Sequence, residues 1–128
     1  MLDYVTIGTN AFEDAVVFYA AALGALGFKQ IWKSDGFIGY GSPEGQPKLF
    51  VMQPFDGKPA CVGNGMMIAL AAPSRAAVRA FHSAALAAGG SSEGEAGVRD
   101  QYAPDFYAAY VRDRDGNKLA AVCHSTSE

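Results

Sequence analysis

An internal duplication limits the possible fold of this 128-residue chain more than any other feature. Displaced by 63 positions, "DYVTIGTNAFEDAVVFYAAALGALG" aligns with "MMIALAAPSRAAVRAFHSAALAAGG". Displaced by 70, "GYGSPEGQPKLFVM" aligns with "AYVRDRDGNKLAAV", so the second copy carries seven additional residues, which we place within "SSEGEAGVRDQYAP". Repetition over such lengths indicates two similar structural units in tandem. Identical pairs include Phe18 and Phe81, Ala22 and Ala85, Gly27 and Gly90, Tyr40 and Tyr110, Lys48 and Lys118, and Leu49 and Leu119.

Each copy is expected to begin with a strand, at residues 2–7 and 66–71, and to continue with a helix. Asn10 is predicted to cap the first helix, with Glu13 as its capping-box partner, and Gly27 to end it. Ser74 is predicted to cap the second helix. The apolar positions at helical spacing are Phe12, Val16, Tyr19, Leu23 and Leu26 in the first helix, and Val78, Phe81, Ala85 and Leu86 in the second.

Three further strands should complete each copy. In the first they are expected at residues 28–33, 37–41 and 48–53; in the second, two are expected at 106–112 and 117–124. The remaining strand cannot be located in the Gly- and Ser-rich stretch after the second helix. The sequence therefore predicts an α+β fold of two tandem βαβββ units in a single domain, 1–128. Its parts are a first half at 1–53, a connector at 54–65 and a second half at 66–124.

Composition argues against several classes of partner. The net charge is −3 and Lys and Arg are not clustered, so we expect no nucleic-acid binding. The longest nearly uncharged run, residues 15–28, is too short to cross a bilayer and follows acidic residues, so neither a membrane partner nor a secretory signal is expected. Cys61 and Cys123 form no CxxC pair, and two reduced thiols would suit a cytoplasmic protein, although spacing alone does not exclude a disulfide.

Three segments, "DYVTIG", "FYAAALGALGF" and "YVRDRDGNKLAAV", together resemble the vicinal oxygen chelate superfamily over nearly the whole chain. This group comprises glyoxalases, bleomycin-resistance proteins and extradiol dioxygenases. The resemblance implies that the two units curl a mixed sheet into a cup that holds the ligand, with the helices outside. It also implies that members commonly form homodimers, and that the enzymes hold a divalent metal with His, Glu or Gln from four strands.

The four ligand positions carried over from this resemblance are Tyr4, Phe50, Met67 and Ala120. A divalent metal in such a site requires imidazole nitrogen or carboxylate and amide oxygen. None of the four side chains supplies these donors. We therefore expect no metal site and no cofactor.

Strand alternation predicts what would line the cup instead, because residues two apart share a face of the sheet. The inward face would be mostly apolar, which suits a hydrophobic or aromatic small molecule. Alternatively, Phe50 and Met52 fill the cup as core residues. The predicted inward residues are Tyr4, Thr6, Phe50, Met52, Met67, Ala69, Ala120 and Val122; those predicted to pack under the helices are Val5, Ile7, Leu49, Val51, Ile68, Leu70, Leu119 and Ala121.

Polar and aromatic residues outside these strands are further candidates. Arg99, Tyr102 and Tyr107 lie in a stretch that would cover the cup and grip an anionic or aromatic ligand, or would instead supply surface charge and strand packing. His124 shares the parity of the inward strand residues; it either faces the cup mouth as an acid-base group or belongs to a frayed end. Trp32 lines the cup or a subunit contact.

Three functions stay open at this point. The leading hypothesis is a metal-free protein that binds a small hydrophobic or aromatic molecule, as in the bleomycin-resistance branch. The second is a lyase, isomerase or dioxygenase, either metal-dependent or using Tyr4 or His124 without a metal. The third is a filled cup with a surface that serves self-association. The expected partners are a small-molecule ligand and a second copy of the chain.

Overall fold

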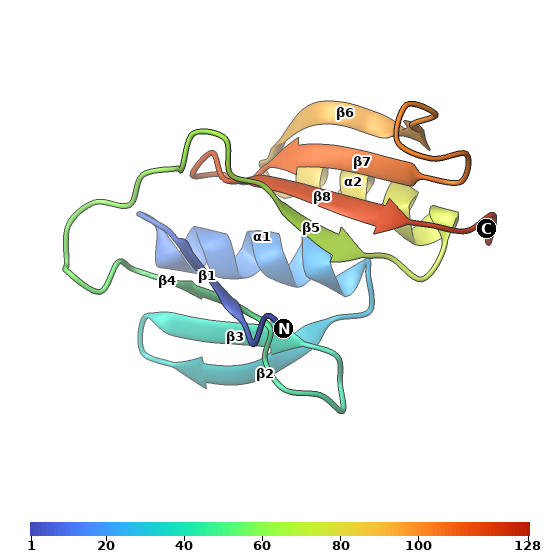
Figure 1. Ribbon diagram of the computed structural model, residues 1–128. Helices are drawn as coiled ribbons and strands as arrows, with labels where there is room; N and C mark the ends of the chain where they lie inside the picture. Colours follow the sequence, from blue (N-terminus) through green and yellow to red (C-terminus); the bar gives the residue numbers. More distant parts are fainter.

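The computed structural model describes all residues from 1 to 128 and contains two helices and eight strands (Figure 1). The first half contains β1 (Val5–Gly8), α1 (Phe12–Gly24), β2 (Lys29–Ser34), β3 (Phe37–Gly41) and β4 (Leu49–Met52). The second half contains β5 (Ile68–Ala71), α2 (Arg75–Ala87), β6 (Ser91–Val98), β7 (Tyr107–Arg112) and β8 (Lys118–Cys123).

Each half forms its own four-stranded mixed sheet, with strand orders β1-β4-β3-β2 and β5-β8-β7-β6. In each sheet the first strand of the half pairs in parallel with the last, and the other neighbours are antiparallel. The predicted α+β fold of two βαβββ units is therefore confirmed. Neither helix is long and apolar enough to cross a membrane.

The strand that the sequence did not locate is β6, in the Gly- and Ser-rich stretch. Its pairing with β7 is irregular between Ser92 and Gly94, and again between Gly94 and Gly97. It is an edge strand with few apolar side chains, and irregular pairing interrupts the alternation that reveals a strand in sequence.

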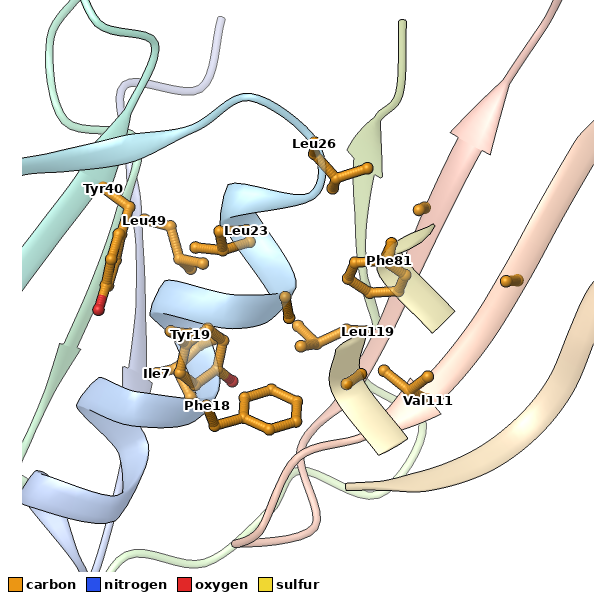
Figure 2. Close-up of a cluster of buried hydrophobic side chains, with 14 of the residues drawn as sticks. Ile7, Phe18, Tyr19, Leu23, Leu26, Tyr40, Leu49, Phe81, Val111 and Leu119 are labelled. Carbon is orange, nitrogen blue, oxygen red and sulfur yellow. The ribbon is translucent and has the colours of Figure 1, made fainter. Parts of the chain in front are cut away.

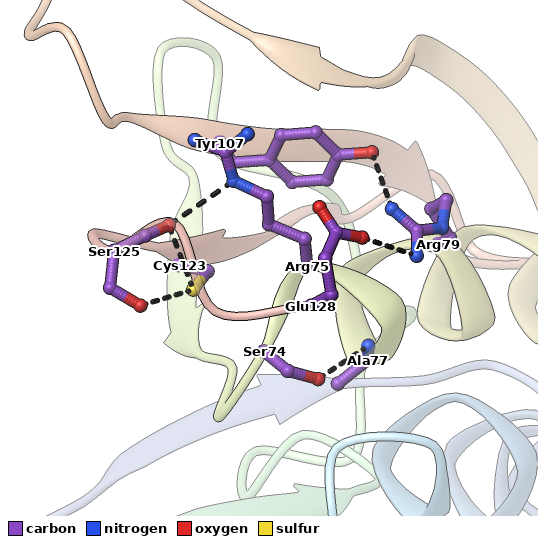
Figure 3. Close-up of polar contacts among 8 residues, drawn as sticks. All are labelled: Ser74, Arg75, Ala77, Arg79, Tyr107, Cys123, Ser125 and Glu128. Carbon is purple, nitrogen blue, oxygen red and sulfur yellow. Dashed lines mark hydrogen bonds and ion pairs between the residues drawn. The ribbon is translucent and has the colours of Figure 1, made fainter.

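One helix cap was predicted correctly and the other was wrong. Ser74 Oγ accepts a hydrogen bond from the Ala77 backbone N–H at 3.1 Å (Figure 3). Asn10 does not cap α1; its side chain instead makes two hydrogen bonds to the backbone of Ala60 in the connector, at 2.9 and 2.7 Å. Thr9 Oγ1 accepts from the Ala11 N–H at 3.1 Å. Asn10 therefore holds the connector, residues 54–65, against the start of α1 by hydrogen bonds.

One large hydrophobic core joins the halves (Figure 2). Phe18 and Leu23 of α1 and Phe81 of α2 are completely or almost completely buried in it. In Figure 1, α1 lies between the two sheets, and α2 covers one face of the second sheet. The alternation predicted for β1, β4, β5 and β8 is confirmed, because the residues assigned to the helix side form or contact this core. Leu86 is an exception among the helix positions, since it is 39% exposed.

The repeat alignment is wrong by one residue at β3. Tyr40 pairs with Leu49, whereas Leu119, the equivalent of Leu49, pairs with Val111. Tyr40 therefore corresponds to Val111, and the β3–β4 connection is one residue longer than the β7–β8 connection. Because a one-residue slip turns a side chain to the other face of a sheet, Tyr40 is buried under α1 while Tyr110 lies on the face away from the helices.

The turn between β7 and β8 fastens the second half to the first. Asp113 accepts hydrogen bonds from Tyr19 Oη on α1 at 2.5 Å and from Asn117 Nδ2 at 2.9 Å, as well as from two backbone N–H groups of the turn. Asp115 accepts from Thr9 Oγ1 at 2.6 Å and from the Asn10 N–H at 2.9 Å. These acidic residues therefore stabilise a turn and the contact between the halves.

Candidate functional site

Two hollows lie on the faces of the sheets that turn away from the helices. The first hollow has a volume of about 630 Å³ and the second about 620 Å³, and they share no lining residue. The first hollow is lined by Asp3, Tyr4, Thr6, Trp32, Phe37, Gln46, Pro47, Phe50 and Met52. The second hollow is lined by Met67, Glu93, Gly94, Arg99, Gln101, Tyr102, Phe106, Tyr110 and Lys118.

Aromatic rings dominate the first hollow. The Phe50 ring stacks on Phe37 with centroids 4.9 Å apart and meets Tyr4 edge-on at 5.0 Å. Tyr4 and Trp32 are each 54% exposed, so large apolar surfaces remain available around these rings. Offset or edge contacts with such rings favour flat apolar ligands.

Gly39 makes room for the Phe50 ring. Gly39 pairs with Phe50 across β3 and β4, and a Cβ atom added to Gly39 would lie 2.6 Å from Phe50 Cε1. Such a distance is a steric clash, so the ring can lie against the strand only because residue 39 has no side chain. In this position Phe50 lines the hollow and does not fill it.

The second hollow is more polar, and two cations lie beside its central ring. The Arg99 guanidinium carbon is 5.4 Å from the centroid of Tyr110, and Lys118 Nζ is 5.8 Å from the same centroid. Arg99 also donates to the Gly97 carbonyl at 2.9 Å and to the Glu95 carbonyl at 2.6 Å. These bonds hold the guanidinium over the edge of the sheet.

Small residues and an aromatic rim complete the second hollow. Ala108, Ala120 and Val122 form a small buried cluster on this face, with Phe106 and Tyr110 packed against it. Phe106 meets Tyr102 at 5.1 Å and His124 at 5.3 Å, both edge-on. His124 is exposed beside this rim.

The structure divides the predicted site residues between the two hollows. Those at the first are Tyr4, Thr6, Phe50 and Met52; those at or beneath the second are Met67, Arg99, Tyr102, Ala120, Val122 and His124. Trp32, whose direction was left open, lines the first hollow.

Tyr107 requires a correction, because it lies on the opposite, helix-facing side of the second sheet (Figure 3). Its hydroxyl accepts a hydrogen bond from Arg79 Nη1 at 3.2 Å, and the guanidinium of Arg75 lies 4.9 Å from its ring centroid. The reason is strand alternation: Tyr107 is the first residue of β7 and has the parity of the core residue Val111, not that of Tyr110.

Sequence reasoning missed several lining residues. Lys118 lies two residues before Ala120 on the same strand face, so alternation alone could have identified it. Phe37 and Tyr110 pair with Met52 and Ala120, and these registers depend on turn lengths that the sequence does not reveal. Phe106, also missed, lines the second hollow from just before β7.

The residues at the family's metal positions do not fit a divalent metal. Tyr4 and Phe50 lie at the first hollow, while Met67 and Ala120 lie at or beneath the second. Together they offer a phenol and a thioether, but no imidazole or carboxylate. No group of three or more His, Cys, Asp or Glu side chains in the structure could hold a metal ion.

Comparison with known proteins places this fold in a family. The profile described as "Glyoxalase/Bleomycin resistance protein/Dioxygenase superfamily" matches residues 1–121. A crystal structure of a glyoxalase/bleomycin resistance protein from Albidiferax ferrireducens T118 is 37% identical, with a TM-score of 0.83, over 95% of this chain and 97% of that one.

More distant structures share the fold alone. A glyoxalase-related enzyme from Fulvimarina pelagi is 20% identical, with a TM-score of 0.72, over 96% of this chain and 87% of that one. A lactoylglutathione lyase from Agrobacterium tumefaciens is 18% identical, with a TM-score of 0.63, over 94% and 90%. No curated protein matched the chain in sequence. On the evidence of the profile and the 37% identical structure, the chain belongs to the glyoxalase/bleomycin resistance protein/dioxygenase superfamily.

Proposed function

We propose that this chain binds a small hydrophobic or aromatic molecule without a metal ion, and that the first hollow receives its apolar part. The observation that carries the proposal is the open aromatic lining formed by Tyr4, Trp32, Phe37 and Phe50. Covering about 150 Å² of apolar ligand surface would contribute about 4 kcal/mol before the costs of association. Such a gain offsets no more than the lower end of those costs, so the apolar contact by itself predicts weak binding of a bicyclic ring.

We also propose that the protein works as a homodimer. Both hollows are open, and they lie on two sheets that are not joined by strand pairing. A two-fold axis would place the first hollow of one copy against the second hollow of the other, and would form two identical closed sites. Exposed Trp32 and Met67 would then be covered.

The proposed location is the cytoplasm. Cys61 and Cys123 are both free thiols in the structure, one exposed and the other buried. Unpaired cysteines of this kind suit a reducing compartment.

A titration with the neutral probe 2-naphthamide tests the binding proposal. Trp32 is the only tryptophan, so its indole N–H gives one resolved NMR signal from the first hollow. We expect calorimetric binding, a shift of that signal, and a loss of affinity of at least about tenfold in Phe50→Ala. Phe55→Ala is the matched control, because Phe55 is 99% exposed and lines neither hollow.

Absence of binding at millimolar probe, or equal affinities of the Phe50→Ala and Phe55→Ala variants, would contradict the proposal. So would a stoichiometric divalent metal retained by the purified protein.

Mixing two weakened variants tests the shared site, with tight binding of 2-naphthoate, the carboxylate analogue of the probe, as the readout. In a mixed dimer of Phe50→Ala and Arg99→Met chains, one site carries both changes and the other carries neither. Random exchange should therefore restore about a quarter of the sites. If both hollows of one site came from a single chain, mixing would restore none.

A further inference from the structure

Charge divides the two hollows sharply. Asp3 is the only charged residue that lines the first hollow, which has no cation. Arg99 and Lys118 both line the second hollow, together with Glu93. In the proposed homodimer, a ligand between the first hollow of one copy and the second hollow of the other would meet aromatic surface at one end and cations at the other.

The two cations are available to a ligand. Neither Arg99 nor Lys118 takes part in any of the four ion pairs of the structure. Arg99 uses two N–H groups on the carbonyls of Gly97 and Glu95, and a guanidinium carries five, so three donors remain. The two carbonyl bonds also hold the group in place, which reduces the entropy lost when an anion binds.

Glu93 offsets only part of the charge of this pair of cations. Its carboxylate accepts a hydrogen bond from Arg112 Nε at 2.7 Å. This hydrogen bond and the charge of Arg112 lower the pKa of Glu93, with a smaller contribution from Lys118. Glu93 thus stays ionised and engaged with Arg112, which leaves a net positive charge around Tyr110.

We propose that the ligand is an aromatic carboxylic acid, and that Arg99 and Lys118 bind its carboxylate while the first hollow receives its ring; this rests on the proposed function. A guanidinium matches the planar carboxylate with two parallel hydrogen bonds. Arg99, Lys118 and Glu93 together give the lining one net positive charge, which matches a singly charged carboxylate better than a dianion such as a phosphate monoester. The ligand class is therefore a singly charged aromatic acid.

The test compares 2-naphthoate with the isosteric neutral 2-naphthamide on the full chain, by calorimetry. We expect 2-naphthoate to bind at least about tenfold more tightly at low ionic strength, with the advantage shrinking as salt is added. Arg99→Met and Lys118→Met should each remove most of this advantage, because each weakens the binding of 2-naphthoate more than that of 2-naphthamide. Lys48→Met is the matched control, since Lys48 occupies the equivalent position before β4 and lines neither hollow.

Each other outcome is decisive. Equal affinities for the acid and the amide would overturn the carboxylate site and leave the proposed function standing, whereas binding of neither probe would overturn both. Tighter binding of 2-naphthyl phosphate than of 2-naphthoate would overturn the preference for a single charge. If Arg99→Met and Lys118→Met both still bind 2-naphthoate more tightly than 2-naphthamide, the carboxylate binds outside the second hollow and the proposal is wrong. If Arg99→Met fails to fold by circular dichroism, Lys118→Met gives the same comparison, because the Lys118 side chain makes no hydrogen bond to the backbone.

Discussion

At the scale of single residues, each sheet pairs an aromatic residue with a small residue on the face that turns away from the helices. In the first half Phe50 of β4 lies over Gly39 of β3, and in the second half Tyr110 of β7 pairs with Ala120 of β8. In the first half the aromatic residue is on the last strand, β4, whereas in the second half it is on the strand before the last, β7. The ring is aromatic and apolar in the first hollow, and is flanked by cations in the second.

Replacing Gly39 by Ala should displace the Phe50 ring. We expect a loss of about 1–3 kcal/mol in the free energy of unfolding, because the new methyl group would lie 2.6 Å from the ring. Urea denaturation measures this loss. Gly24→Ala, at the end of α1 with no atom within 4 Å of the added Cβ, should be neutral or stabilising.

The double variant Gly39→Ala/Phe50→Ala separates this clash from an effect on the backbone. With the ring removed, the Gly39→Ala change should cost much less than in the parent chain. An undiminished cost would show that the ring is not the reason for glycine at this position.

Tyr40 should make stability fall in alkaline solution. Burial raises the pKa of Tyr40 from its ordinary value of 10.0 to about 12. Between these values the unfolded chain releases the phenolic proton while the folded chain keeps it, so the free energy of unfolding falls by up to about 1.4 kcal/mol per pH unit as pH rises. Well below pH 10 the phenol is protonated in both states, so it does not change the free energy of unfolding with pH. Denaturation curves of Tyr40→Phe should show a shallower decline above pH 10, and parallel declines in both proteins would contradict this assignment.

At the scale of elements, the β7–β8 turn determines how the halves meet. Gly116 has φ 96°, a conformation that favours glycine, and its turn presents Asp113 to Tyr19 and Asp115 to Thr9. Burial, followed by the charge of Asp113, raises the pKa of Tyr19 well above its ordinary value, so this phenol stays a donor. The turn thus contributes to the contact between halves as well as to its own strands.

Removal of the Asp113 carboxylate should be costly. We expect Asp113→Ala to lower the free energy of unfolding by about 3 kcal/mol, because four hydrogen-bond donors lose their acceptor at a buried position. Thermal denaturation measures the difference. Asp105→Ala removes an exposed carboxylate with one long ion pair and should change stability by less than about 0.5 kcal/mol; similar effects of the two substitutions would contradict the role of the turn.

The sequence was sufficient for elements with strong periodicity and failed where the backbone is irregular. The spacing of apolar residues predicts both helices and the side chains of β1, β4, β5 and β8 that face them. These side chains are in, or packed against, the hydrophobic core. Interrupted pairing concealed β6, and a connection one residue longer misaligned Tyr40. The sequence predicts Tyr107 in the site because it lies in the stretch expected to cover the cup, and the register that gives this strand its inward and outward faces does not follow from the sequence.

At the scale of the whole molecule, the shared core supports the proposal that residues 1–128 form one domain. Side chains from both helices and both sheets meet in it (Figure 2). We expect one cooperative unfolding transition, with Trp32 fluorescence from the first half coinciding with the far-ultraviolet circular dichroism of both helices. Two separated transitions would indicate that the halves are independent domains.

Two tandem units of one fold thus present chemically different surfaces on the sheet faces that turn away from the helices. The first offers exposed rings and the second offers Arg99 and Lys118. The duplication explains why both halves have the same strand order. Different residues at equivalent strand positions explain why the two surfaces differ.

A crystal structure of the protein with 2-naphthoate tests the central claim most directly. The naphthyl ring should lie against Phe50 and Trp32 in the first hollow, without a coordinated cation. Density for the ring at another site, or a metal ion bound beside Tyr4, would contradict the claim.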